Sequence, residues 1–167
     1  MYAFLPALLL AGCVAKPDQV EPVANFDSAR YLGKWYEIAR LDHSFERGLS
    51  QVSATYSLRD DGGIKVLNRG YDGEKKQWKE AQGKAYFVER ADQGFLKVSF
   101  FGPFYGSYIV FALDQKDYRY SMVSGPNKSY FWLLSRSPTM DDATKKILLT
   151  KAAQLGFDTS KLVHVQQ

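Results

Sequence analysis

The chain has 167 residues, a formal net charge of +4 and a hydrophobic share of 46%. This length suits one domain with a substantial core. Positive and negative residues are interleaved, so the charge pattern gives little support to nucleic-acid binding. Cys13 is the single cysteine, which excludes an intrachain disulfide and leaves the fold dependent on packing.

Residues 1–12 are predicted to be a signal peptide. An apolar run from Tyr2 to Leu10 leads into small residues and then Cys13, the order of a secretory core and its cleavage site. Leu10-Ala11-Gly12-Cys13 resembles the lipobox of bacterial lipoproteins. That resemblance implies cleavage before Cys13 and its lipidation with diacylglycerol and palmitate, and two or more acyl chains anchor a protein stably. Val14 in place of aspartate implies the outer membrane, facing the periplasm. The alternative is a buried N-terminal helix with an incidental cysteine.

Residues 13–25 are predicted to be a lipidated tether. The segment 14–25 contains two prolines, is weakly apolar and has no periodicity, which is typical of a semi-extended linker. The folded domain is then expected to occupy residues 26–167.

Eight short strands are predicted after Phe26. Runs rich in aromatic and β-branched residues alternate with turn sequences such as Asp61-Gly62. Short connections predict an all-β fold, an eight-stranded antiparallel up-and-down β-barrel. Closure removes exposed strand edges and leaves a bore for side chains or one small ligand. The predicted strands are 35–41, 52–59, 64–71, 78–88, 95–101, 107–113, 118–124 and 130–136.

One α-helix is predicted near the C-terminus, packed outside the barrel. Pro138 prevents an earlier start, Thr139 and Asp142 resemble a capping box, and Gly156 stands where a left-handed cap is expected. A short closing strand is expected within 161–166. The expected apolar face of the helix comprises Met140, Ala143, Ile147, Leu148, Ala152 and Leu155.

Three motifs resemble the signatures of the lipocalin family. Gly33-Lys34-Trp35 opens the first strand, residues 112–114 fall between the sixth and seventh strands, and Arg136 ends the eighth. Residues 25–27, 45–48 and 99–106 are similar to bacterial outer-membrane lipocalins and their apolipoprotein D-like relatives. The resemblance implies that Trp35 plugs the closed end beneath the Arg136 guanidinium, and that Gly33 allows a close approach of the chain. These three residues are interpreted as structural.

The resemblance also implies a ligand site in the open half of the barrel. Loops 42–51, 72–77, 102–106 and 124–129 should lie at the open end, where Phe104 and Tyr105 are predicted to contact an apolar guest; alternatively, their loop folds back into its own core. Asn68 could anchor a head group or a water, or be a satisfied core amide. Strand alternation and the family register place these residues inward: Trp132, Ala54, Tyr56, Val66, Asn68, Val98 and Phe100.

These features predict a membrane-anchored lipocalin that binds or transports fatty acids or lysophospholipids in the cell envelope. The alternative is a structural or interaction module whose aromatic rim docks a partner or a second copy as a homodimer. A third hypothesis, an enzyme acting on membrane lipid, has little support. His43 and His164 lack partners at metal-ligand spacing, and no nucleophile elbow or phosphate loop occurs. No catalytic residue, metal or cofactor is therefore expected.

Overall fold

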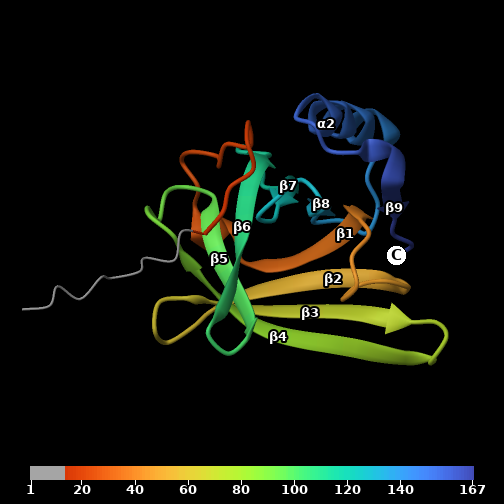
Figure 1. The fold of residues 1–167 in the computed structure, drawn as a ribbon, viewed down its shortest axis with the longest axis horizontal. Coiled ribbons are helices and arrows are strands. Elements are labelled where there is room, and N and C mark those ends of the chain that lie inside the picture. The colour runs from red at the N-terminus through yellow and green to blue at the C-terminus, as the bar shows by residue number, and fades with distance from the viewer. Residues whose placement is uncertain (1–13) are drawn as a thin grey trace, which may run out of the picture.

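The computed structural model describes residues 14–167, so the predicted signal peptide and Cys13 lie outside the described residues. Strand β1 pairs with both β2 and β8, which closes eight antiparallel strands into a barrel (Figure 1). The predicted eight-stranded up-and-down architecture is therefore confirmed. The eight strands are β1 (Gly33–Leu41), β2 (Leu49–Leu58), β3 (Ile64–Asp72), β4 (Gln77–Phe87), β5 (Phe95–Phe101), β6 (Phe104–Leu113), β7 (Tyr120–Ser124) and β8 (Phe131–Ser135).

Several strand boundaries differ from the sequence prediction by one to three residues, and the starts of β6 and β7 bear on the site. Strand β6 begins at Phe104, three residues earlier than expected. Strand β7 begins at Tyr120 rather than at Tyr118, because Tyr118 has a positive φ of 53° and donates its backbone N–H to the Asp114 carbonyl. Tyr118 therefore belongs to the turn.

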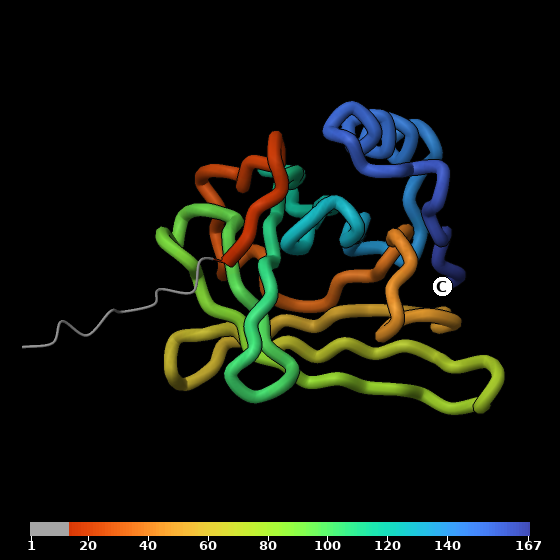
Figure 2. The backbone as a smooth tube through the Cα atoms, in the orientation of Figure 1, coloured from red at the N-terminus to blue at the C-terminus, as the bar shows by residue number. Residues whose placement is uncertain are grey.

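The β3–β4 hairpin extends beyond the rest of the barrel (Figures 1 and 2). The ladder between β4 and β5 covers only Lys84–Phe87 of β4. Within the described part of the chain, residues 77–82 of β4 pair only with β3. The barrel wall is thus interrupted between β4 and β5 on this side, toward the open end.

The C-terminal helix α2 (Asp142–Gln154) begins later than predicted. Its N-cap is Asp141, whose carboxylate accepts a hydrogen bond of 2.8 Å from the Thr144 N–H, so Thr139 does not cap the helix. Gly156 has the expected positive φ of 89°. The apolar face is narrower than predicted: Leu148 and Ala152 are buried, whereas Ala143 is exposed and Ile147 is 70% exposed. The helix therefore contacts the barrel along a narrow strip.

The segments outside the eight strands pack against the barrel wall. After the 3₁₀ helix η1 (Thr159–Lys161), strand β9 (Leu162–His164) pairs with β1. The segment 14–25, expected as a linker, is docked instead: Val20 is fully buried, and Val23 donates its N–H to Val110 and accepts one from Gly94, both at 2.9 Å. Burial of Val20 and partial burial of Val23 explain the docking, since apolar side chains gain by leaving water.

The closed end is built around Trp35. The short helix α1 (Ser28–Tyr31) crosses this end, and its Tyr31 carbonyl accepts a hydrogen bond of 2.8 Å from the Trp35 indole N–H. The Arg136 guanidinium lies 4.0 Å from the Trp35 ring centroid, as the resemblance implies. Gly33 has a φ of 97°, and a Cβ there would lie 3.2 Å from the Arg136 Nη1 atom. Trp35 is fully buried, which seals this end.

Candidate functional site

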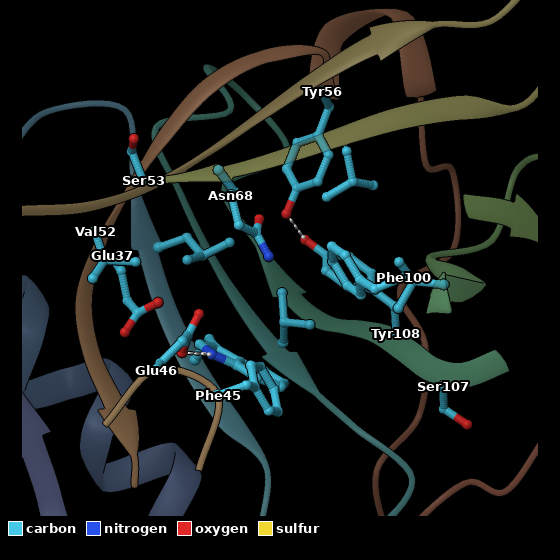
Figure 3. Close-up of a pocket in the computed structure, with 16 residues that line it drawn as sticks. Glu37, Phe45, Glu46, Val52, Ser53, Tyr56, Asn68, Phe100, Ser107 and Tyr108 are labelled. Carbon is cyan, nitrogen blue, oxygen red and sulfur yellow. Dashed lines mark hydrogen bonds between the residues drawn. The ribbon is translucent and has the colours of Figure 1, made fainter. Parts of the chain in front are cut away.

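A cavity of about 100 Å³ occupies the open half of the barrel (Figure 3). Its wall combines an apolar majority with a few polar groups. Seven of the predicted ligand-contact residues line it: Trp132, Ala54, Tyr56, Val66, Asn68, Val98 and Phe100. The further lining residues, none of them predicted as a ligand contact, are Glu37, Phe45, Glu46, Val52, Ser53, Ser107, Tyr108, Val123 and Leu134.

Two predicted contact residues, Phe104 and Tyr105, do not line the cavity. Phe104 is 78% exposed at the tip of the β5–β6 hairpin. Tyr105 lies on the outer wall, where its ring is 5.0 Å from the Lys97 ammonium and 6.4 Å from the Tyr86 ring. Strand alternation explains this position, because Tyr108 on the same strand faces inward. The aromatic residue that borders the cavity while largely exposed is Phe45, in the β1–β2 loop.

A buried group of charged residues supports the mouth of the cavity. Arg40 donates from Nη1 to Glu37 Oε1 and from Nη2 to the Glu46 carbonyl, each at 2.9 Å. All three side chains are buried. Burial raises the pKa of Glu37 well above its ordinary range, the nearby Glu46 raises it further, and Arg40 opposes both. A buried charge without a partner is costly, so Arg40 fixes the loop that follows β1.

Trp132 connects this charged group to the cavity wall. Its indole N–H donates to Glu46 Oε2 at 3.0 Å, and the His43 Nε2 atom lies 2.9 Å from the same oxygen. The His43 ring lies 3.7 Å from Phe45 and 5.3 Å from Trp132, measured between ring centroids. These contacts hold the β1–β2 loop against the barrel interior. A charged residue in a loop carries no burial signal, so Glu46 could not be predicted as part of the wall.

The bottom of the cavity is a row of tyrosine hydroxyls. Tyr56 and Tyr108 share a hydrogen bond of 2.7 Å, Tyr108 and Tyr31 one of 2.9 Å, and Tyr31 and Ser121 one of 3.1 Å. Burial raises the pKa of Tyr31 to about 12, and it raises the pKa values of Tyr56 and Tyr108 well above the ordinary value. The hydroxyls are therefore neutral and act as hydrogen-bonding groups.

Asn68 is a polar group directed into the cavity (Figure 3). Within residues 14–167 its side-chain amide makes no hydrogen bond. The amide is thus free to bind a water or a polar group of a guest, because a carboxamide offers both donors and an acceptor.

No group of three or more His, Asp, Glu or Cys side chains within residues 14–167 could hold a metal ion. Over the same residues, no helix has both the length and the apolar character required to cross a membrane.

Comparison with known proteins places the cavity in a family context. The family described as "Lipocalin-like domain" matches residues 26–167. The chain is 58% identical to "Outer membrane lipoprotein Blc" of Vibrio cholerae, over 100% of this chain and 98% of the relative, and 53% identical to the Escherichia coli K12 protein of that name, over 96% and 92%. The fold is similar to insecticyanin from Manduca sexta, with a TM-score of 0.72, 23% identity and coverage of 92% and 87%.

Proposed function

Because this chain belongs to the lipocalin-like family, we propose that it binds fatty acids or lysophospholipids and transports them in the bacterial cell envelope. The observation that carries this proposal is the cavity, which is mainly apolar, open at one end and bordered by Phe45 and Trp132. A cavity of this kind suits a ligand with an acyl chain and a polar head. The free amide of Asn68 and the buried carboxylates at the mouth supply polar contacts.

The energy available from acyl burial supports a carrier without covalent chemistry. Complete removal of about 16 carbons from water would yield roughly 12 kcal/mol at about 0.8 kcal/mol per methylene, which is an upper limit for a cavity of about 100 Å³. Association and ordering remove much of this gain. A remainder of about 8 kcal/mol corresponds to micromolar affinity, which is enough to hold a lipid and still release it.

We also propose that the chain is lipidated at Cys13 and held at the periplasmic face of the outer membrane. The lipobox-like sequence ending at Cys13 supports this location, as do the names of the two bacterial relatives. Metabolic labelling with palmitate, followed by membrane fractionation, tests it in wild type and Cys13→Ser. Label that persists in Cys13→Ser would contradict acylation at this thiol.

A second candidate function is docking to a partner protein or a second copy. Phe101 and Phe104 at the β5–β6 hairpin are 80% and 78% exposed, and exposed aromatic clusters mark contact sites. Native mass spectrometry separates the candidates. Acyl species that copurify with a monomer support the carrier, whereas a lipid-free dimer that Phe104→Ser dissociates supports docking.

Tryptophan fluorescence provides the direct binding test. The full chain carrying Cys13→Ser, which removes the acylation site, is titrated with fatty acids and lysophospholipids. Saturable change is expected in Trp78→Phe, because Trp78 lies outside the cavity, and loss of most of the change is expected in Trp132→Phe. No response by the parent chain at any chain length would contradict the proposal.

A further inference from the structure

The tyrosine hydroxyls divide the barrel interior into two cavities. Below the larger cavity lies a second one of about 20 Å³ with an entirely apolar wall. Tyr56, Val66, Val98 and Tyr108 line both cavities. The hydrogen bond between Tyr56 and Tyr108, drawn in Figure 3, therefore lies at the boundary between the two cavities. The lower cavity is completed toward the closed end by Phe26, Tyr31, Ile64, Ala85 and Leu96.

We propose that the Tyr56–Tyr108 pair is a specificity determinant that sets how deeply an acyl chain enters, and hence which chain length binds best. This inference rests on the proposed lipid-binding function. The two tyrosines come from β2 and β6, on different sides of the barrel. Their hydroxyls meet across the bore at 2.7 Å. An acyl chain that enters from the mouth is therefore blocked by the Tyr56–Tyr108 pair, which we call the partition.

The partition is rigid because its hydroxyls are held in a continuous network. Tyr108 also bonds Tyr31 at 2.9 Å, and Tyr31 bonds Ser121 at 3.1 Å. The Tyr31 and Tyr56 rings stack with centroids 5.6 Å apart. Swinging one of these side chains about its Cα–Cβ bond would break hydrogen bonds made by its neighbours.

The balance of energies explains why the chain should stop at this level. Each additional buried methylene improves affinity about fourfold. A buried hydroxyl deprived of its partner costs roughly five- to hundredfold. Pushing one methylene between Tyr56 and Tyr108 therefore loses more than it gains. Affinity should rise with chain length until the partition is reached and then level off.

The test measures affinity for saturated fatty acids of increasing length by displacement of a fluorescent fatty acid. Full-length protein carrying Cys13→Ser is compared with Tyr108→Val and, independently, Tyr56→Val. Each variant joins the two cavities and should move the plateau to longer chains. The affinity for a fatty acid two methylenes longer than the parent's plateau, divided by the affinity at the plateau length, should be at least tenfold higher in the variant than in the parent. Tyr105→Val is the matched control, since Tyr105 lies on the same strand but faces outward.

The outcomes separate this inference from the function on which it rests. A shifted plateau in either opening variant, with none in Tyr105→Val, supports the depth limit. An unchanged plateau in folded variants that still bind fatty acid overturns the depth limit alone. Absence of binding by the parent chain at every length overturns both.

Discussion

The plug at the closed end gives the sharpest test of the structural reasoning. Trp35 and Trp78 each lie under an arginine, with guanidinium-to-ring distances of 4.0 Å to Arg136 and to Arg69. They differ in burial, since Trp35 is fully buried and Trp78 is 44% exposed. Substituting each by phenylalanine removes the same atoms in both variants, and the difference reports what the buried setting of Trp35, including its hydrogen bond to Tyr31, contributes.

Trp35→Phe should lower the free energy of unfolding by about 3 kcal/mol. Loss of the indole N–H leaves the buried Tyr31 carbonyl without its donor, which costs about 1–3 kcal/mol. The missing ring atoms leave a void that adds about 1–2 kcal/mol. Trp78→Phe should cost less than about 1 kcal/mol, because exposed substitutions have small effects.

Urea unfolding followed by far-UV circular dichroism measures both variants without relying on tryptophan emission. The slope with denaturant should stay unchanged, so that the midpoint alone reports stability. For a domain of this size the loss corresponds to a melting temperature lower by roughly 6–12 °C. A cost below about 1 kcal/mol for Trp35→Phe, or equal costs for the two variants, would refute the role assigned to the plug.

Three further predictions concern protonation, capping and backbone strain. Because the pKa of folded Tyr31 is raised to about 12 from 10.0, its proton contributes stability that is complete below pH 10 and lost as the pH rises through about 12. Tyr31→Phe should flatten that alkaline decline, as measured by chemical unfolding across the range; an equally steep decline would contradict the buried hydroxyl. Asp141→Ala should destabilise the protein by about 1 kcal/mol, whereas Thr139→Ala should be neutral. Thermal melts that show the opposite order would identify Thr139 as the N-cap of the helix. Gly33→Ala should cost about 1–3 kcal/mol because of its positive φ, while Gly73→Ala, which has open space for a Cβ, should change the melting temperature little; equal effects would remove the case for strain.

The strands were predictable because their signals are local. Alternating apolar residues and short turn sequences lie next to one another in the chain, so residues 95–101 could be assigned as a strand with the observed bounds. Alternation counted back from Arg136 placed Trp132 correctly on the cavity wall. Locally encoded geometry of this kind needs no knowledge of the partner strands.

The parts of the site that the sequence did not reveal depend on distant contacts. Tyr56 and Tyr108 are 52 positions apart, and Glu46 and Trp132 are 86 apart. No local pattern indicates which of these side chains bond one another across the barrel. The position of Tyr105 was missed for another reason: Gly102 and Gly106 suggested that the loop continued to residue 106, whereas β6 already begins at Phe104.

The outer half of β4 has a consequence for association between molecules. Among the described residues 14–167, no strand lies beside residues 77–82 on the side away from β3. Such edges are where sheets of neighbouring molecules fuse. Charged side chains lie along this edge: Lys79 forms an ion pair with Asp72 at 2.7 Å, and Glu80 forms one with Arg69 at 3.5 Å. A strand from another molecule would have to strip water from these ions. The same hairpin can therefore remain unpaired without turning the barrel into a template for fibrils.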